Sequence, residues 1–266
     1  MTISSDGIGI ETRDGVLRIT LDRPAHKNAL DVPAIRRIVA VLESAATDDA
    51  LRVVLLSGNG ADFCSGADWV ATNAARTRPR TGSIQRRTKL QAHRAIELLR
   101  DIQLPVVCRV RGWAAGLGFQ LALAADFTIA AESACLWEPF IERGFSADSG
   151  ATWLLPRLVG VARAKELLLL GRKLSGAEAA AWGLVHRAVP EAELDAATDA
   201  LVEALGRGPT VALGLTKQTI HRSLETGLGE AMQNESTALE LSSRTADFKE
   251  GLLAFKERRA ARFEGN

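Results

Sequence analysis

The amino-acid sequence predicts an α/β fold with buried strands. Two short apolar segments, residues 53–57 and 106–111, are each followed by glycine and have the length and composition of buried strands. A segment of helical character follows the second one at residues 118–125, and a further strand is expected at residues 127–130. Because strand, glycine turn and helix recur in this order, the chain is expected to build a sheet covered by helices.

The N-terminal part of the chain predicts a hairpin followed by a helix. Residues 9–13 and 16–22 alternate apolar and polar side chains on either side of Asp14-Gly15, a dipeptide typical of tight hairpin turns. Residues 33–46 carry apolar side chains at helical spacing and have a proline in the first turn. We therefore expect a two-stranded edge and one helix ahead of the buried strands.

Residues 71–87 predict an irregular surface loop. The segment contains five arginines and few large apolar side chains, so it offers little for a core to bury. Two interpretations are open at this point. The loop is either a solvated basic segment or a mobile flap that closes over an anionic ligand.

The C-terminal third of the chain is expected to be helical. Ser175 and Glu178 have the spacing of a capping box that opens a helix. Residues 210–223 and 229–263 predict two more helices, the second interrupted near Asp247. These helices have too few apolar positions per turn to stand alone. We expect a core of residues 1–200, and a helical region of residues 201–266 that packs on this core and on a neighbouring subunit.

Composition excludes several classes of partner. The chain has 266 residues, 33 basic and 32 acidic, and this balance favours neither nucleic acid nor a membrane surface. No apolar run approaches the ~20 residues of a membrane-spanning helix, and the N-terminus has no signal-peptide pattern. The unpaired cysteines indicate a reducing compartment, the cytoplasm; they are Cys64, Cys108 and Cys135. The four histidines share no metal-ligand spacing, so no metal site is predicted.

Two glycine turns stand where a strand ends and backbone N–H groups can be presented to a ligand. Gly66-Ala67-Asp68 follows the first buried strand, and Gly116-Leu117-Gly118 opens the helix after the second. A helix N-terminus favours negative charge. Either turn alone also fits an ordinary loop.

A dinucleotide-binding loop is a second interpretation of the glycines near residue 116. Gly112, Gly116 and Gly118 have the spacing found in short-chain dehydrogenases. Those enzymes use a catalytic tyrosine, however, and this chain contains no tyrosine. The glycines also lie far from the first strand, where such a fingerprint belongs. We therefore set the dehydrogenase interpretation aside.

Asp148 is the candidate proton-transferring side chain. It lies among small residues in the segment 144–150, just before a predicted helix at residue 151. One interpretation is a carboxylate that caps this helix. The other is a carboxylate directed into a cleft, where it can move protons.

Taken together, these segments resemble the crotonase family, the enoyl-CoA hydratases and isomerases. The matching segments are residues 21–30, 53–68, 105–126, 144–170 and 248–259. The resemblance implies a crotonase-like spiral of strand–strand–helix repeats with a helical C-terminal region that trimerises, giving a homotrimer or a hexamer. It also implies an acyl-CoA thioester as substrate, with coenzyme A as part of that substrate and no separate cofactor.

The resemblance assigns roles to the two glycine turns. It implies that the backbone N–H groups of Ala67 and Leu117 form an oxyanion hole for the thioester enolate, a charge that two such donors stabilise by ~3 kcal/mol each. Residues implied to contact the acyl-CoA are Ala25, Lys27, Gly66, Asp68, Gly116, Gln120 and Phe140. By the same resemblance, Phe255 and Arg258 of a neighbouring subunit complete the coenzyme A site.

The chain departs from the hydratases at both catalytic glutamates. The resemblance places these two positions at Gln120 and Phe140, while Glu138 and Glu142 are two residues out of register. Asp148, by contrast, matches the aspartate of dienoyl-CoA isomerases and of the ring-epoxide isomerases of the phenylacetyl-CoA pathway. One base suits a 1,3-proton shift, so we expect an isomerase. The alternatives are a hydratase that uses another carboxylate and a non-catalytic acyl-CoA binder.

Overall fold

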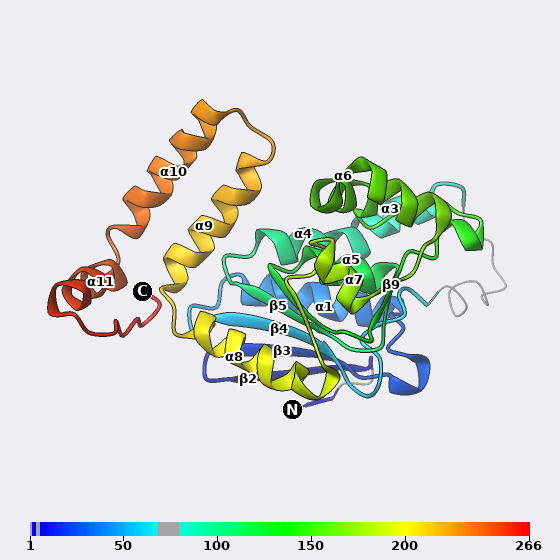
Figure 1. Cartoon of the computed structure of the whole chain (residues 1–266), viewed down its shortest axis with the longest axis horizontal. Helices are drawn as coiled ribbons and strands as arrows, with labels where there is room; N and C mark the ends of the chain where they lie inside the picture. Colours follow the sequence, from blue (N-terminus) through cyan, green and yellow to red (C-terminus); the bar gives the residue numbers. More distant parts are fainter. Residues whose placement is uncertain (1, 4–5, 69–79) are drawn as a thin grey trace.

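The computed structural model describes residues 2–3, 6–68 and 80–266 of the chain. Strands form the centre of the molecule, helices cover it on both sides, and three C-terminal helices extend to one side (Figure 1). The predicted α/β class is confirmed.

In the described residues, seven strands form the main sheet in the order β1-β2-β3-β4-β5-β7-β10. Their bounds are β1 Thr2–Ile3, β2 Ile8–Arg13, β3 Val16–Leu21, β4 Val53–Gly58, β5 Val106–Val110, β7 Phe127–Ala131 and β10 Arg187–Val189. The first three strands pair antiparallel and all the later pairs are parallel. Asp14 and Gly15, between β2 and β3, both have positive φ, as the predicted primed hairpin turn requires.

A second, smaller sheet gives the chain its repeating unit. Its strands are β6 (Trp113–Ala115), β8 (Cys135–Trp137) and β9 (Leu174–Ser175). β5, β6 and helix α5 (Leu117–Ala124) form one strand–strand–helix unit, and β7, β8 and helix α6 (Ala151–Leu170) form the next. In each unit the first strand joins the main sheet and the second joins the small one. The predicted repeat of strand, strand and helix is therefore present.

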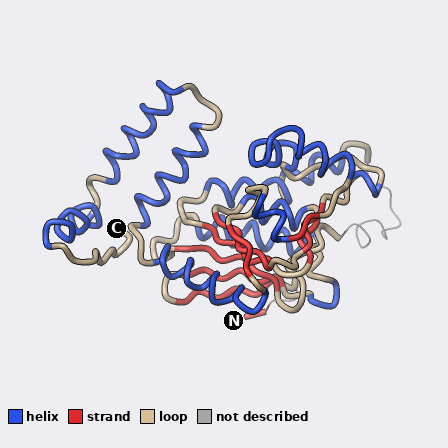
Figure 2. Tube along the Cα trace, viewed as in Figure 1, coloured by secondary structure: helices blue, strands red, loops and turns tan. Residues whose placement is uncertain are grey.

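Helices cover both faces of the main sheet (Figure 2). α1 (Val32–Ala45), α4 (Ala92–Asp101) and α5 lie on one face, and α8 (Leu194–Gly206) lies on the other. Side chains of β4 alternate between the two sides: Val54 and Leu56 join the main core, whereas Val53 and Leu55 pack under α8. Because both faces are buried, this strand has the continuous apolar sequence from which it was predicted.

The remaining short elements connect these layers. They are the 3₁₀ turns η1 Pro24–His26, η2 Ile141–Arg143 and η3 Glu191–Glu193, and helix α7 Gly176–Ala181. The capping box predicted for α7 is present, because the Ser175 hydroxyl accepts from the Glu178 N–H and the Glu178 carboxylate accepts from the Ser175 N–H. The chain is kinked within α6 at Gly160, which has non-helical dihedral angles.

Three helices form a C-terminal arm beside the core (Figure 1, yellow to red). They are α9 Thr210–Ser223, α10 Leu228–Ser242 and α11 Ala246–Glu257. The predicted helix over residues 229–263 is thus two helices. The Thr245 side chain caps the second one by accepting from the Phe248 N–H at 3.1 Å. The prediction that helix continues to residue 263 is wrong, since Arg258 adopts a left-handed conformation and ends α11.

An ion pair between Lys217 and Asp126 ties the arm to the core. Lys217 of α9 lies with its Nζ 2.7 Å from the Asp126 carboxylate, and it also donates to the carbonyls of Leu99 and Leu104. The predicted boundary at residue 200 falls inside α8, which packs on the sheet, so the arm begins after that helix.

The loop predicted over residues 71–87 is only partly within the described residues, because residues 71–79 lie outside them. Residues 83–89 form helix α3 (Ser83–Lys89), so the loop prediction is wrong there. The helix begins after Gly82, which takes the left-handed conformation, and most of its residues are good helix formers. It packs on α4, which supplies the tertiary contact that the sequence pattern did not reveal.

Candidate active site

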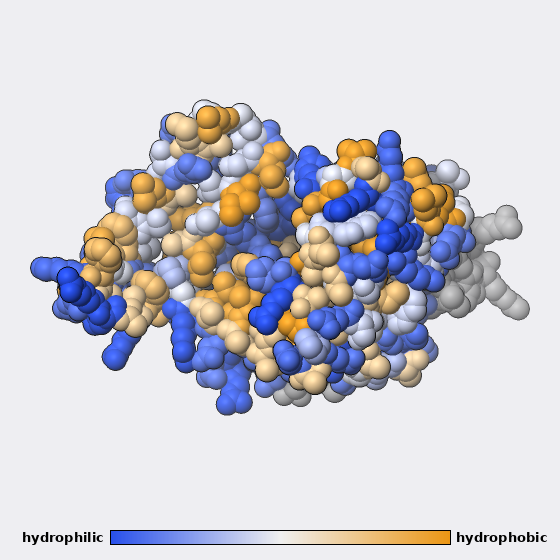
Figure 3. Space-filling view, in the orientation of Figure 1, coloured by the Kyte–Doolittle hydropathy of each residue, from blue (hydrophilic) through white to orange (hydrophobic). Residues whose placement is uncertain are grey.

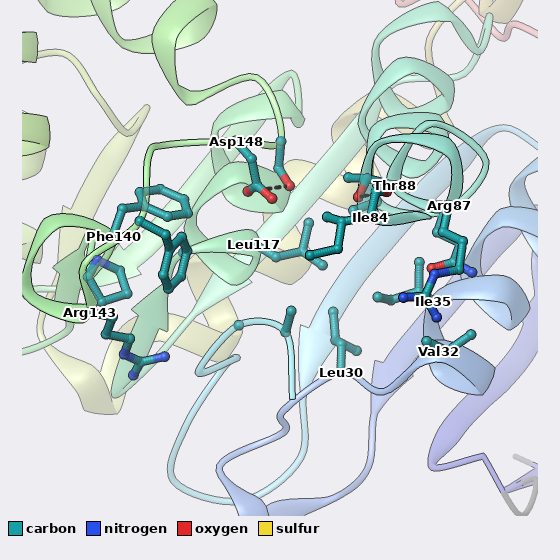
Figure 4. Close-up of a pocket in the computed structure, with 18 of the residues that line it drawn as sticks. Leu30, Val32, Ile35, Ile84, Arg87, Thr88, Leu117, Phe140, Arg143 and Asp148 are labelled. Carbon is teal, nitrogen blue, oxygen red and sulfur yellow. Dashed lines mark hydrogen bonds between the residues drawn. The ribbon is translucent and has the colours of Figure 1, made fainter. Parts of the chain in front are cut away.

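A pocket lies where the first turns of α1, α4 and α5 meet the segment before α6 (Figure 4). Its lining is mostly apolar and includes backbone from both glycine turns. The lining residues are Leu30, Val32, Ile35, Ser65, Gly66, Ala67, Ile84, Arg87, Thr88, Gln91, Ala92, Gly116, Leu117, Pro139, Phe140, Arg143, Phe145, Asp148 and Ser149. The structure therefore brings Ala67, Leu117 and Asp148 to a single cavity.

The strand-like pairing around Ala67 directs its N–H away from the neighbouring chain. Gly66 accepts from the Leu30 N–H at 2.8 Å, and the Asp68 N–H donates to the Leu30 carbonyl at 2.8 Å. Backbone groups of consecutive residues in an extended segment point to opposite sides. The N–H of Ala67 thus points away from Leu30.

Close backbone contact places the two glycine turns side by side. A methyl group built on Gly66 would lie 2.7 Å from the carbonyl oxygen of Ala115 and 3.6 Å from the nitrogen of Leu117. A methyl group on Gly118 would lie 2.4 Å from the carbonyl oxygen of Cys64. Glycine is therefore required at both positions for the turns to approach each other.

Leu117 is the first residue of α5, so its N–H has no carbonyl one turn earlier in the helix. The helix N-terminus also carries a partial positive charge. Ala67 also lines this pocket, so its N–H is a second candidate donor. Such a pair can stabilise negative charge on a carbonyl oxygen.

Asp148 lines the same pocket from the segment that precedes α6 (Figure 4). Its carboxylate accepts a hydrogen bond from the Ser149 hydroxyl. The N-cap of α6 is Gly150, and no side chain caps this helix end. Instead, the backbone carbonyl of Asp148 accepts from the Ala151 N–H at 3.0 Å. The interpretation of Asp148 as a side-chain helix cap is therefore wrong.

Aromatic rings flank the carboxylate side of the pocket. Phe140 is buried and packs edge to face against Phe145, with ring centroids 5.6 Å apart. Both rings line the pocket, on the side that Phe140 occupies in Figure 4. They line this side of the pocket with apolar surface, which strengthens electrostatic interactions beside it.

Glu138 and Glu142 lie outside the pocket lining. Glu138 is fully buried beneath it and accepts a hydrogen bond from the Gln120 amide. Burial raises the pKa of the Glu138 carboxyl well above its usual range, against the lowering effect of the Gln120 hydrogen bond. Glu142 is exposed on η2. Among the lining residues that the structure describes, Asp148 is the one carboxylate.

Gln120 also lies outside the lining, although it was expected to contact substrate. Its side chain is fully buried and directed at Glu138. Phe140, Gly66 and Gly116 line the pocket as expected. Ala25, Lys27 and Asp68 lie outside the lining, so their contact with a substrate stays a prediction.

Covalent catalysis by the thiol beside the turn is disfavoured. Burial raises the pKa of the Cys64 thiol to about 12, so the thiolate that such chemistry needs is scarce at neutral pH. The Cys64 sulfur instead accepts from the Gly66 N–H at 3.4 Å, and it thereby supports the turn. In the described part of the chain, no three potential metal ligands cluster together.

Aromatic and cationic side chains gather next to the Ser65 side of the pocket. Lys27 lies with its Nζ 5.2 Å from the centroid of the Trp113 ring, and Lys173 lies 4.5 Å from that of Trp137. The Lys27 carbonyl accepts from the Ser65 N–H, which connects this group to the pocket. Of these residues only Lys27 was predicted from the sequence. The signal that was missed is the pair of tryptophans, which lie in the short strands β6 and β8.

Phe255 and Arg258 lie at the far end of the C-terminal arm. Phe255 is on α11 with 85% of its surface exposed, and Arg258 follows that helix. Neither lines the pocket of its own chain. Their contribution to the site of a neighbouring subunit stays a prediction.

Comparisons with known proteins agree with this geometry. The family model described as enoyl-CoA hydratase/isomerase matches residues 11–266. The chain is 36% identical to the 1,2-epoxyphenylacetyl-CoA isomerase of Escherichia coli over 94% of this chain and 95% of that protein. It is 30% identical to the trans-2-decenoyl-[acyl-carrier-protein] isomerase of Streptococcus mutans over 95% of each chain.

A solved structure shows the same architecture. The enoyl-CoA hydratase of Bacillus anthracis superposes with a TM-score of 0.91 and 32% identity, over 98% of this chain and 100% of that one. The predicted crotonase-like fold is confirmed by this match and by the family model. Relatives of this chain thus include both isomerases and hydratases. The chain belongs to the enoyl-CoA hydratase/isomerase family, the crotonases.

Proposed function

We propose that this protein is an acyl-CoA isomerase in which Asp148 moves a proton along an enolate held by the N–H groups of Ala67 and Leu117. One observation carries the proposal. Among the described residues that line the pocket, Asp148 supplies the one carboxylate, and it shares that pocket with both backbone donors. Glu138 and Glu142, which a hydratase mechanism would recruit, lie outside the lining.

The reaction needs one base and one charge-stabilising site. The Asp148 carboxylate removes a proton from a carbon next to the thioester or next to the double bond. The electron pair of the broken C–H bond moves into the conjugated system, and the thioester oxygen becomes an enolate oxygen. Two backbone N–H groups donate hydrogen bonds to this oxygen and stabilise its charge, and removing one such donor typically costs ~10²–10³-fold in turnover. The protonated carboxyl then returns its proton to a different carbon, so the double bond shifts while composition is unchanged.

The apolar lining fits an acyl chain, and the cationic border fits its carrier. Leu30, Val32 and Ile35 form one wall of the pocket. Lys27 stands at the neighbouring turn, where the phosphates of coenzyme A would meet a positive charge. The E. coli relative acts on a coenzyme A thioester, in keeping with this carrier. A carrier that is part of the substrate leaves no need for a separate cofactor.

We further propose that the protein acts in the cytoplasm as a trimer or as a hexamer of two trimers. Figure 3 shows apolar surface over the arm and a hollow between the arm and the rest of the molecule. The large exposed apolar residues of the arm are Ile220, Leu224, Leu228, Met232, Leu239, Leu241, Phe248, Leu252, Leu253 and Phe255. Exposed apolar surface of this extent is typical of an interface between subunits. Separately, the described helices include none with the length and apolarity that a bilayer crossing requires.

A product assay tests the proposed function. Purified protein is incubated with a panel of 2-enoyl-, 3-enoyl- and ring-containing acyl-CoA thioesters, and the products are separated from substrate by chromatography and then weighed by mass spectrometry. An isomer of unchanged mass supports the proposal. A product heavier by one water identifies a hydratase, and binding without turnover of any member of the panel supports a non-catalytic acyl-CoA binder.

A further inference from the structure

Gln120 and Glu138 form a polar pair that is fully enclosed beneath the pocket. Gln120 lies in the first turn of α5, and Glu138 lies directly after β8. Both side chains are 0% exposed, and the Gln120 amide donates to Oε1 of Glu138. Two oxygens of this pair, Gln120 Oε1 and Glu138 Oε2, are buried and have no hydrogen-bond partner among the described residues.

An ionised Glu138 does not account for these two oxygens. A carboxylate is acceptor-only, so Glu138 Oε2 and Gln120 Oε1 would be two acceptors without a donor. Burying a charge away from water is also costly unless a cation pairs with it. One proton added to Glu138 removes the buried charge and supplies the missing donor. A carboxylic acid carries an O–H donor, and the Gln120 Oε1 acceptor lies in the same enclosed pair.

The electrostatic surroundings favour the same state. Burial raises the pKa of Glu138, the Gln120 hydrogen bond lowers it, and the negative charge of Asp148 raises it further. Asp148 comes from the segment before α6, and Gln120 comes from α5, so the elements on both sides of Glu138 contribute to this balance.

We propose that Gln120 and Glu138 form an uncharged amide–carboxylic acid pair, with Glu138 protonated at neutral pH. Gln120 is three residues after Leu117, in the same helical turn, and Glu138 is followed by two residues that line the pocket. The pair therefore holds the turn that carries the Leu117 donor against the loop that carries Phe140. Glu138 acts here as a positioning residue, because it lies outside the pocket lining.

An uncharged Gln120–Glu138 pair leaves the enolate oxygen free of electrostatic repulsion from below the pocket. A fixed negative charge close to the oxyanion hole would repel the charge that develops on the thioester oxygen. It would also place a second negative charge close to the Asp148 carboxylate. This catalytic consequence rests on the proposed function, whereas the protonation state of Glu138 does not, so the two can fail separately.

Infrared spectroscopy tests the protonation state directly. The difference spectrum between the wild type and Glu138→Gln at neutral pH should show loss of a carboxylic-acid C=O band. The control is Glu142→Gln, which removes an exposed carboxylate from the same loop and should show loss of a carboxylate band. Loss of a carboxylate band in the Glu138 variant would overturn the proposal, whatever reaction the protein catalyses.

The pH dependence of unfolding gives a second test. A raised pKa means that Glu138 stays protonated in the folded protein at a pH where the unfolded chain has already released this proton. The contribution of Glu138 to the free energy of unfolding therefore falls as pH rises. Relative to Glu138→Gln, the unfolding equilibrium constant of the wild type should grow by about tenfold per pH unit. Both proteins are also measured in an Asp148→Asn background, which removes the neighbouring negative charge that acts on Glu138. Parallel stability curves from about pH 5 to about pH 8 would contradict a protonated Glu138.

Turnover separates positioning from proton transfer. Glu138→Ala leaves the Gln120 amide without a partner and should lower kcat by ~10-fold or more, with a smaller change in KM. Glu138→Gln keeps a buried donor and acceptor and should restore kcat to within about threefold of the wild type. If Glu138→Gln folds and is as inactive as Glu138→Ala, then Glu138 transfers protons and the proposal is wrong. The infrared test decides the matter if Glu138→Ala fails to fold.

Discussion

The Ser149 hydroxyl donates a hydrogen bond to the Asp148 carboxylate, with 3.0 Å between Ser149 Oγ and Asp148 Oδ1. Ser149 is buried and has φ of 52°, a left-handed conformation that is uncommon outside glycine. A strained backbone is maintained where the surrounding structure requires it. Here it turns the chain so that the hydroxyl fixes the orientation of the neighbouring carboxylate at the pocket.

Removing this hydroxyl should slow the reaction. In Ser149→Ala, the Asp148 carboxylate loses one neutral hydrogen-bond donor, worth ~0.5–1.5 kcal/mol, so kcat should fall by ~2- to 10-fold with little change in KM. Steady-state kinetics of the isomerisation measure this effect. Ser146→Ala, an exposed serine of the same segment, is the control and should keep wild-type kcat. Equal rates for the two variants would mean that Ser149 does not orient the base.

Close packing of the two glycine turns predicts the effect of a single added methyl group. In Gly118→Ala the new methyl would start 2.4 Å from the Cys64 carbonyl oxygen, so α5 must shift and the Leu117 donor moves with it. We expect a stability loss of ~1–3 kcal/mol from overpacking. Activity should fall by ~10² or more if one oxyanion donor is lost.

Gly229→Ala is the control for Gly118→Ala, because it adds the same methyl group away from the pocket. Gly229 of α10 has open space around the position of an added methyl group. Gly229→Ala should therefore leave activity unchanged and keep or slightly raise stability, by up to ~1 kcal/mol, because alanine favours helix. Denaturant unfolding and kinetics of both variants separate the two cases. Wild-type activity in Gly118→Ala would place the oxyanion hole elsewhere.

The buried ion pair between Lys217 and Asp126 predicts a large effect on stability. Lys217→Met would leave the partly buried Asp126 carboxylate without its cation, and losing a partner of a buried pair typically costs ~3–5 kcal/mol, an upper bound here. The arm should become more accessible to protease, because Lys217 ties α9 to the core. Denaturant unfolding measures the loss. Lys217→Met combined with Asp126→Asn should recover part of it, and no recovery would show that the lysine acts through its carbonyl contacts alone.

The exposed apolar residues of α10 predict self-association. Leu228 and Met232 are 78% and 53% exposed in the isolated chain and are one helical turn apart. Replacing both by glutamate should convert the proposed trimer into monomers, because charges are not tolerated at the centre of a subunit interface. Light scattering coupled to size exclusion measures the mass. Glu230→Gln on the same helix is the control, and a monomeric wild type at micromolar concentration would refute the assembly.

Much of the fold could be predicted from the sequence because its signals are local. Asp14-Gly15 fixes a hairpin turn by its own backbone preference, and Ser175 with Glu178 caps α7 within four residues. The apolar strand β4 is recognisable because both its faces are buried. Helix α3 was missed because its stability depends on packing against α4, which residues 83–89 alone do not show.

The site residues that lie in motifs shared with the family could be predicted from the sequence. Those that depend on contacts between distant parts of the chain could not. Ala67, Leu117 and Asp148 were predicted from their motifs, and the structure places them at one pocket. The pairing of Gln120 with Glu138 joins residues 18 positions apart on different elements, so no spacing rule indicates it. The burial of both side chains sets their hydrogen bonding and the pKa of Glu138, and burial is a property of the folded chain.

The central claim is that Asp148 transfers the proton, and deuterium exchange tests it most directly. The wild type and Asp148→Asn are each incubated with a saturating enoyl-CoA substrate in deuterated water, and deuterium at the exchanging carbon is followed by NMR. Asparagine keeps the size of the side chain but accepts no proton. We expect the wild type to isomerise the substrate and to incorporate deuterium, because the protonated Asp148 carboxyl can exchange with the deuterated solvent while the enolate is held. In the variant both should fall by at least ~10²-fold, with unchanged substrate affinity. Exchange at the wild-type rate in Asp148→Asn would contradict the central claim.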